Sequence, residues 1–367
     1  VMDSKLALEA SGLAGYARDS AQTATLALLE GGATGNTFRL DCAEQPSYCV
    51  RTLRPGQDDL LSHTTEVLAV HGVTPRVIAS SGKMLVTELV AAKPITVPEL
   101  GDPSNAKLET VATLVARLHK VPVDEVKVAS RDELQWWLTK AEASLPDMDA
   151  AMREALRAEV AAAASVDMPA PDTPAGRLSV THGDLHPGNI LVSSEAKDAW
   201  LVDLEHVGPR PSVCDIAYMF AVWGDIRYMH GWKPSAATPT PYAELASRQH
   251  FAKVYLSSVN ETAATDQDVE AYLGHVEQCG HLTRLRLMLI WLLMARGDPK
   301  HMMVGAVAAY LPHLKHARAI LQAIQGGDNT LAQDVINVDS SSSRLPGLQL
   351  RLQQTRLCGV CARRCIS

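Results

Sequence analysis

The chain has 367 residues, of which 47% are hydrophobic and 20% are charged, and its formal net charge at pH 7 is -7. This hydrophobic content and low net charge exclude an intrinsically disordered protein, and the length allows two lobes with separate cores. The charge is uneven, because the segment from Val338 to the end contains five arginines against one aspartate and carries +4. The preceding 337 residues therefore carry -11. Such an acidic body argues against nucleic acid as the natural ligand, since clustered Lys and Arg bind phosphate backbones.

The seven cysteines are too few and too scattered for a disulfide framework. Four of them are isolated in the sequence: Cys42, Cys49, Cys214 and Cys279. These fit reduced, buried thiols of an intracellular protein. The other three lie within residues 358–365, among serines and arginines. Because a zinc site normally needs four ligands, we expect residues 331–367 to be a disordered basic tail rather than a metal site.

No segment resembles a targeting signal or a membrane span. The N-terminus contains acidic residues instead of the basic start and apolar run of a signal peptide. The most apolar run, residues 287–295, has nine residues, whereas a membrane span needs about 20. We therefore expect a cytoplasmic protein, and the sequence is compatible with a homodimer.

The first hundred residues are predicted to be rich in β-strands. Alternating or apolar runs predict strands over residues 25–29, 37–41, 48–53, 76–78 and 84–89. The glycine-containing loop after the first strand predicts a hairpin with the second. A helix is predicted over residues 58–71, because acidic residues lie in its first turn and Gly72 follows its end. Residues 80–83 are predicted as the turn between the last two strands.

The chain becomes helical after Pro94. Apolar residues at helical spacing predict helices over residues 105–119, 131–143 and 149–164, and through most of 215–324. Two short strands, residues 178–180 and 200–202, flank a segment rich in polar motifs. We therefore expect an α+β protein, with a small β-rich lobe over residues 1–92 and a larger, mainly helical lobe over residues 93–330.

The segment that carries chemistry is Thr181-His-Gly-Asp-Leu-His-Pro-Gly-Asn189, followed later by Asp203-Leu-Glu205. It places Asp184, Asn189 and Asp203 on loops beside short apolar strands. Carboxylate and amide oxygens of this kind suit Mg²⁺. An Asp followed five residues later by Asn is also the catalytic-loop pattern of phosphotransferases, in which the Asp accepts the substrate proton. An Asx turn is the structural alternative for the first pair, and the presence of Asp203 favours the functional interpretation.

These motifs resemble the aminoglycoside phosphotransferase and choline kinase superfamily, small-molecule kinases with a protein-kinase-like fold, over about residues 25–325. The resemblance implies a two-lobe fold, with a small antiparallel sheet in the N-lobe and a larger helical C-lobe. It also implies ATP and Mg²⁺ as cofactors, and a small-molecule alcohol as the substrate.

The resemblance implies a role for each residue of the motif. By the family pattern, Asp184 is the catalytic base, and Asn189 and Asp203 bind Mg²⁺. Asp215 is a buried anchor for the catalytic loop, and His182 is structural rather than a base. For His186, which follows in the motif, a surface position and a substrate contact are both open.

The glycine-rich loop near the N-terminus resembles the nucleotide loop of choline and ethanolamine kinases, whose glycines let backbone N–H groups approach phosphates. The ATP contacts that it implies are Gly31, Gly32, Thr34 and Asn36. Arg51, on a strand that follows this loop, stands where protein kinases and most aminoglycoside kinases have Lys. In the choline kinase branch, this position is Arg. Because Arg can bind phosphate bidentately, the substitution preserves the role in ATP binding.

Glu66 is the candidate partner that orients Arg51 from the following helix, with Asp58 and Asp59 as rivals. The strand that includes Glu88 and ends near Val90 fits the hinge, where backbone groups would meet adenine. An ordinary strand between the lobes is the alternative.

The substrate is predicted from acidic and aromatic residues. Quaternary ammonium groups bind against aromatic faces, and Trp291 resembles a tryptophan of the choline cage, although it could equally fill a helical core. Glu205 could pair with a cation, and Asp184 would meet the hydroxyl. Four positions depart from choline kinases: His186, His206, Val222 and Met294. They leave ethanolamine, another amino alcohol, thiamine or an aminoglycoside open.

We therefore predict an ATP-dependent, Mg²⁺-requiring kinase that phosphorylates the hydroxyl of a cationic alcohol of the choline or ethanolamine type. An aminoglycoside- or thiamine-type phosphotransferase is one alternative. An inactive nucleotide-binding pseudokinase is another, against which the intact Asp184, Asn189 and Asp203 argue.

Overall fold

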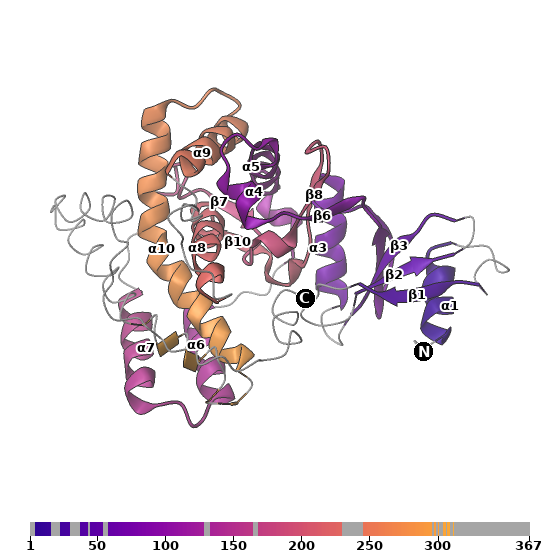
Figure 1. Ribbon diagram of the computed structural model, residues 1–367, viewed down its shortest axis with the longest axis horizontal. Coiled ribbons are helices and arrows are strands. Elements are labelled where there is room, and N and C mark those ends of the chain that lie inside the picture. The colour runs from indigo at the N-terminus through magenta and orange to yellow at the C-terminus, as the bar shows by residue number, and fades with distance from the viewer. Residues whose placement is uncertain are drawn as a thin grey trace. The chain divides into compact units, whose positions relative to one another are not determined.

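The computed structural model describes most of the chain: residues 4–15, 23–29, 37–42, 45–53, 58–127, 133–163, 168–229 and 245–295, with 297–298, 300, 304–305, 307–308 and 311. The predicted tail, residues 331–367, lies outside this part. The described residues form two compact units (Figure 1). The first contains those up to 127 and from 169 to 276, and the second those from 133 to 168 and from 277 onward. The lobe boundary near residue 92 stays a prediction.

The first unit begins with α1 (Ser4–Leu13), followed by an antiparallel five-stranded sheet (Figure 1). Its strands are β1 (Thr25–Leu28), β2 (Thr37–Asp41), β3 (Tyr48–Thr52), β4 (Val77–Ser81) and β5 (Met84–Glu88), in the spatial order β1-β2-β3-β5-β4. Helix α3 (Asp58–Val70) joins β3 to β4. The predicted strands and helix are therefore present. β4 extends three residues beyond its predicted end, because Ser81 pairs with Met84 and the turn is shorter than predicted.

The pleat of this sheet separates its core from its open face. Alternate residues of a strand point to the same side. Phe38 and Leu40 of β2, Val50 of β3, and Met84 and Val86 of β5 pack with α1 in one buried cluster. The residues between them therefore face the opposite side of the sheet, away from α1. Helix α1 was not predicted, and its contacts with this cluster account for its position.

Two small sheets follow in the first unit. One has three antiparallel strands in the order β6-β8-β9: β6 (Ala92–Pro94), β8 (Ile190–Ser193) and β9 (Ala199–Leu201). The other pairs β7 (Leu178–Thr181) with β10 (Gly208–Pro211) in antiparallel register. The polar motif lies between β7 and β8 and includes the short helix η2 (Pro187–Asn189). Asp203 lies between β9 and η3 (Leu204–His206). The two predicted strands of this region are thus confirmed to within one residue.

Helices make up most of the remaining first unit. They are α4 (Val97–Gly101), α5 (Ala106–His119), η1 (Val123–Glu125), α8 (Val213–Met229), α9 (Leu245–Asn260) and α10 (Asp266–Met294), the last continuing into the second unit. Helix α5 packs on α9 and beside β7, β8 and β9. Its buried Leu108, Val111, Val115 and Leu118 recur at the spacing of one helical face, as the sequence predicts.

The second unit contains α6 (Glu133–Ser144), α7 (Ala150–Ala163) and the end of α10. Helices α6 and α7 pack on each other. The guanidinium carbon of Arg286 lies 5.9 Å from the centre of the Trp137 ring, within reach of a cation–π interaction. In the part of the chain that is described, no helix is long and apolar enough to cross a membrane. The fold is thus α+β, with a small antiparallel sheet followed by a mainly helical region, as predicted.

Candidate active site

The catalytic loop, residues 182–189, is fixed at its start by Asp215, which lies in the first turn of α8 and is 2% exposed. The Asp215 carboxylate accepts hydrogen bonds from the backbone N–H groups of His182, at 2.6 Å, and Gly183, at 2.9 Å. Nε2 of His119, on α5, lies 3.2 Å from the same carboxylate. Burial by itself raises the pKa of Asp215, but the His119 hydrogen bond and charge, with the Gly183 N–H, hold it below its ordinary value. Asp215 therefore remains an anion.

His182 joins the catalytic loop to the end of β9. Its Nδ1 accepts a hydrogen bond from the Asp184 N–H at 3.2 Å, so its proton lies on Nε2, 2.9 Å from the carbonyl oxygen of Val202. The ring is fully buried. Because both ring nitrogens are used in the structure of the loop, His182 is not available as a base.

Gly183 is required at its position by its backbone and its surroundings. Its φ is +77°, in the left-handed region that side chains rarely adopt. A Cβ atom would also lie 2.4 Å from the carbonyl oxygen of His206. The tight turn before Asp184 therefore depends on glycine.

Asp184 and Asn189 face each other across the loop. Asn189 donates from Nδ2 to the backbone carbonyl of Asp184 at 3.0 Å, so the oxygen of its amide remains the atom suited to a cation. Asp184 Oδ1 accepts a hydrogen bond of 2.5 Å from the hydroxyl of Tyr218. Burial raises the pKa of Asp184, but the neighbouring His186 and the Tyr218 hydrogen bond bring it below its ordinary value. At neutral pH, Asp184 is therefore ionised and able to accept a proton.

His186 lies beside this carboxylate. Its Nδ1 accepts a hydrogen bond from the Gly188 N–H at 3.1 Å, and its Nε2 is 3.7 Å from Asp184 Oδ2. Burial lowers the pKa of His186, outweighing the opposing effect of the Asp184 charge. The sequence left its position open, and the structure places it half-buried next to Asp184.

A backbone hydrogen bond of the preceding residue holds Asp203 next to the catalytic loop. The Val202 N–H donates to the carbonyl oxygen of Asn189 at 3.0 Å. Asp203 itself has φ 62° and ψ 63°, a left-handed conformation that Asp tolerates better than most residues. Its side chain is 41% exposed. A conformation of this kind costs a residue other than glycine about 1 kcal/mol or more.

Asn189 and Asp203 together supply oxygen donors that fit Mg²⁺. This cation is usually held by one or two protein oxygens, several waters and substrate phosphates, rather than by a complete protein cage. Among the described residues, no cluster of three or more His, Cys, Asp or Glu is arranged for a metal.

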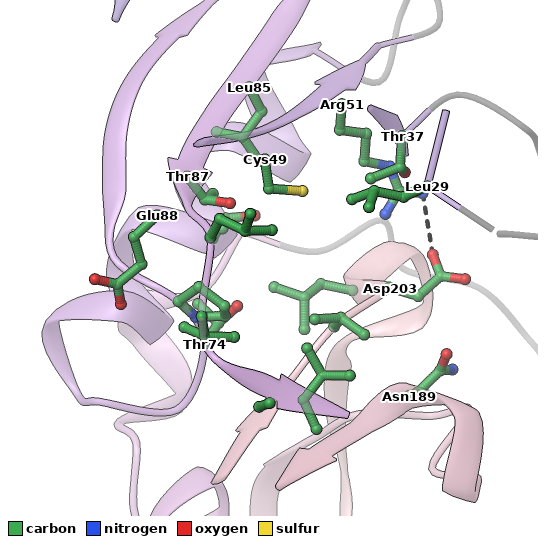
Figure 2. A pocket seen from close by; sticks show the side chains of 18 of the residues that line it. Leu29, Thr37, Cys49, Arg51, Thr74, Leu85, Thr87, Glu88, Asn189 and Asp203 are labelled. Carbon is green, nitrogen blue, oxygen red and sulfur yellow. Dashed lines mark hydrogen bonds and ion pairs between the residues drawn. The ribbon is translucent and has the colours of Figure 1, made fainter. Parts of the chain in front are cut away.

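Arg51 reaches the same place from β3. Its Nη2 is 3.0 Å from Asp203 Oδ1 (Figure 2). It also forms an ion pair with Glu205 Oε1. Glu66, the candidate partner, is not paired with Arg51 in this structure and instead accepts a hydrogen bond from the Ser80 hydroxyl at 2.9 Å. The reason is geometric, because α3 packs beside β4 and presents the exposed Glu66 to that strand. The side chains of the two rivals on α3 lie outside the described residues.

A cavity of about 350 Å³ lies between the open face of the large sheet and the catalytic loop. We call it the nucleotide pocket, after the ATP contacts that the sequence predicts around it. The residues that line it from alternate positions of the strands are Thr37, Cys49, Arg51, Leu85 and Thr87. Figure 2 shows Cys49, Arg51 and Thr87 directed into it, with Asp203 facing Arg51. Asn189 lines the opposite wall. The pocket therefore joins the sheet to the residues of the polar motif.

The remaining predicted ATP contacts lie at the rim of this pocket or beyond the described residues. Glu88 and Val90 both line it, and the Glu88 carboxylate accepts a hydrogen bond from the Arg76 N–H at 2.9 Å. The four loop positions fall outside the described part: Gly31, Gly32, Thr34 and Asn36. The residues on either side of that loop, Leu29 and Thr37, line the pocket and are joined by a backbone hydrogen bond. The ATP contacts stay predictions.

Two of the three predicted substrate residues, Glu205 and Trp291, differ in their surroundings. Glu205 is 21% exposed and pairs with Arg51, so its acidic group is already engaged. Trp291 is 4% exposed and lies on α10, in the second unit. Its role in substrate binding stays a prediction.

Sequence reasoning missed Tyr218 and His119 as neighbours of the site. A signal for Tyr218 was present, since it lies three residues after Asp215 on one helix and therefore on the same helical face. His119 offered no such signal, because 96 residues separate it from Asp215.

Several solved structures resemble this chain in fold. A solved choline kinase from Cryptosporidium parvum Iowa II is 16% identical over 90% of this chain and 100% of its own, with a TM-score of 0.68. An ethanolamine kinase from Plasmodium vivax is 13% identical over 85% and 87%, with a TM-score of 0.63. An amicoumacin kinase in complex with AMP-PNP and Ca²⁺ is 11% identical over 86% and 94%, with a TM-score of 0.58. At such identities, the likeness is one of fold.

The sequence comparisons give the family. No curated protein matches the chain. The family model of the phosphotransferase enzymes matches residues 25–245, more than half of the chain, including the nucleotide pocket and the catalytic loop. The chain therefore belongs to the phosphotransferase enzyme family.

Proposed function

We propose that this phosphotransferase transfers the γ-phosphate of ATP to the hydroxyl of a small cationic alcohol of the choline or ethanolamine type. The observation that carries the proposal is the convergence of Asp184, Asn189 and Asp203 beside a pocket that also contains Arg51. Enzymatic phosphoryl transfer depends almost entirely on positioning and on charge neutralisation, so this arrangement contains the parts that the reaction needs.

ATP would occupy the nucleotide pocket. Leu85 and Leu61 offer apolar surface for the adenine ring, and the chain from Glu88 to Val90 offers backbone groups at the rim. Arg51 would meet the phosphates, since its guanidinium already lies beside the residues proposed to hold the cation. To do so, it must exchange at least one carboxylate partner for phosphate oxygens.

Mg²⁺ would be held by the amide oxygen of Asn189 and the carboxylate of Asp203. When bound, it neutralises charge on the β- and γ-phosphates. Asp203 currently pairs with Arg51, so the carboxylate is oriented toward the region in which a phosphate-bound cation would lie.

Asp184 would act as the base. The substrate oxygen forms its bond to the γ-phosphorus as the bond from that phosphorus to ADP breaks, and the hydroxyl proton passes to the Asp184 carboxylate. The pKa of this carboxyl lies below its ordinary value, so it is ionised at the pH of the reaction. A cation on the substrate would be attracted by the acidic groups of the loop and by the -11 carried by residues 1–337.

The experiment is a substrate panel. The full chain is incubated with ATP, Mg²⁺ and either choline, ethanolamine, thiamine or an aminoglycoside, and the phosphorylated product is measured by mass spectrometry. We expect a phosphorylated amino alcohol that disappears when the metal is chelated. If only the aminoglycoside were phosphorylated, the substrate class would be aminoglycosides instead of amino alcohols. The absence of product with all four compounds would overturn the proposal.

Asp184→Asn tests the assignment of the base. General base catalysis contributes about 10²–10⁴-fold, so kcat should fall by that factor while binding of AMP-PNP is unchanged. Asp172→Asn, which alters an exposed carboxylate in the same unit, is the matched control and should retain wild-type activity. Equal kcat in both variants would exclude Asp184 as the base.

A further inference from the structure

One buried tyrosine contacts the carboxylate that performs the chemistry. Tyr218 is 4% exposed, and its hydroxyl donates to Oδ1 of Asp184 at 2.5 Å. We infer that Tyr218 is a positioning residue, which fixes the Asp184 carboxylate and leaves Oδ2 as the oxygen that accepts the substrate proton. The inference rests on the proposed function and extends it to a residue outside the sequence motif.

The position of Tyr218 on α8 connects two tasks. Asp215 lies in the first turn of the same helix and binds the backbone N–H groups of His182 and Gly183. Tyr218 follows three residues later, on the same face of the helix, and binds the side chain of the next loop residue, Asp184. One turn of α8 therefore holds both the main chain of the catalytic loop and its reactive carboxylate.

The second oxygen of Asp184 has much weaker contacts. The nearest donors are Nδ2 of Asn189, at 3.5 Å, and Nε2 of His186, at 3.7 Å. Hydrogen bonds from nitrogen to oxygen are usually 2.7–3.2 Å long. Since the phenolic proton is already directed at Oδ1, Oδ2 is the oxygen with room for the proton of an incoming hydroxyl.

The hydrogen bond from Tyr218 limits rotation of the Asp184 carboxylate about the last torsion of its side chain. The last torsion of an aspartate has no sharp staggered minima, so an unrestrained carboxylate samples many orientations. A buried phenol, held by the packing of α8, removes that freedom before the substrate binds. Correct orientation of reacting groups is one of the largest contributions to catalysis, and a displacement of about 1 Å can cost about 100-fold in rate.

Tyr218→Phe tests the inference, because it removes the hydroxyl and retains the ring. We expect kcat to fall by about 10- to 100-fold, while KM for the alcohol and binding of AMP-PNP change little. The fraction of ATP that is hydrolysed without phosphorylating the alcohol should rise, since a misoriented base no longer selects the substrate hydroxyl over water. The ratio of ADP to phosphorylated product measures this loss of coupling.

Tyr272→Phe is the matched control. Tyr272 is also buried, lies in the same unit, and its ring packs against that of Tyr255, with 5.5 Å between the ring centres, rather than against Asp184. Its variant should keep both kcat and the coupling ratio, even if its thermal midpoint falls. All rates are compared at a temperature at which the variants are folded, as judged by circular dichroism.

A double-mutant cycle provides a second measurement. If Tyr218 acts through Asp184, Tyr218→Phe should have no further effect on kcat in the Asp184→Asn background. A full additional loss in that background would overturn the inference, as would wild-type kcat and coupling in Tyr218→Phe alone. A fall in nucleotide and alcohol binding equal to the fall in kcat would assign Tyr218 a structural role instead. Failure of the proposed function is distinct, since the wild-type chain would then phosphorylate none of the alcohols.

Discussion

The catalytic loop and the nucleotide pocket are neighbours in one compact unit, but they are stabilised in different ways. In the loop, the carboxylate of Asp215 is buried and binds two backbone N–H groups and His119. In the pocket, Arg51 is paired with Asp203 and Glu205, side chains that remain partly exposed. The loop is therefore complete without a ligand, whereas the pocket contains an ion pair that a ligand must rearrange.

The two regions should therefore contribute to different quantities. The catalytic loop contributes to the free energy of unfolding, and the pocket contributes to the binding of nucleotide. Leaving one buried polar group unsatisfied costs about 1–3 kcal/mol, while an exposed ion pair contributes about 1 kcal/mol or less. Disruption of the loop should therefore reduce both stability and activity. Disruption of the pocket should reduce nucleotide affinity with little effect on stability.

The largest effect is expected from Asp215→Ala. The change leaves the N–H groups of His182 and Gly183 and the ring of His119 without their acceptor, at a cost of about 3 kcal/mol or more. Chemical denaturation should show this loss, together with a severe loss of activity. Asp172→Ala, at an exposed site, is the control and should change stability by less than about 0.5 kcal/mol. Similar stability of the two variants would contradict the role of Asp215 as an anchor.

Gly183→Ala is expected to have the next largest effect. The added methyl group meets the His206 carbonyl and the residue must keep a positive φ, which costs about 2 kcal/mol or more. Gly274→Ala is the matched control, since its Cβ would meet nothing within 4 Å. Because Gly274 lies in helix α10, alanine should stabilise the protein there by about 0.5–1 kcal/mol. Opposite signs of the two changes in thermal midpoint would support the geometry of the turn.

Arg51→Met tests whether the pocket contributes to nucleotide binding more than to stability. Loss of hydrogen bonds to a charged group costs about 1.5–3 kcal/mol, so KM for ATP should rise about 10- to 100-fold. The free energy of unfolding should change by only about 1 kcal/mol, because the ion pair is partly exposed. Arg39→Met removes an arginine of the same sheet that pairs with Asp41 outside the pocket. An equal rise in KM for both variants would remove Arg51 from the phosphate site.

The parts of this comparison that could be predicted from sequence are the local ones. Alternation along residues 37–41 and 48–53 identified strands, and their pleat places Arg51 on the face opposite Val50 and the sheet core. The spacing of Asp184 and Asn189 identified the loop, and the family resemblance supplied roles for its residues. These features depend on neighbours within a few residues, which a sequence displays directly.

The partners of Arg51 could not be predicted in the same way. Asp203 is 152 residues away in sequence, and its contact with Arg51 depends on how the loop after β9 approaches the sheet. Spacing alone suggested Glu66, because it lies on the next helix, but the side on which α3 packs directs that residue to Ser80. Tertiary approach, rather than local pattern, determined which carboxylates meet the arginine.

A third carboxylate, outside both regions, should produce the smallest effect. Glu99, in α4, accepts hydrogen bonds from the backbone N–H of Thr96 and from Lys107. Burial raises the pKa of Glu99, but the Lys107 and Thr96 hydrogen bonds outweigh it and lower the pKa from 4.5 to about 2. Because the folded-state pKa is the lower one, ionised Glu99 stabilises the folded protein. Its contribution is present above pH 4.5 and is lost as the pH falls toward about 2.

Glu99→Gln should therefore destabilise the protein by about 1 kcal/mol at pH 7, since the site is partly open to water. The difference from wild type should shrink as the pH is lowered below 4.5, which urea denaturation at several pH values would measure. Glu195→Gln removes a far more exposed ion pair with Lys197 and should change stability less. If the difference in stability between wild type and Glu99→Gln were just as large near the lowered pKa of about 2, the charge of Glu99 would not be its cause. The loss of stability would then come from weaker helix capping, because glutamine preserves the capping geometry only in part.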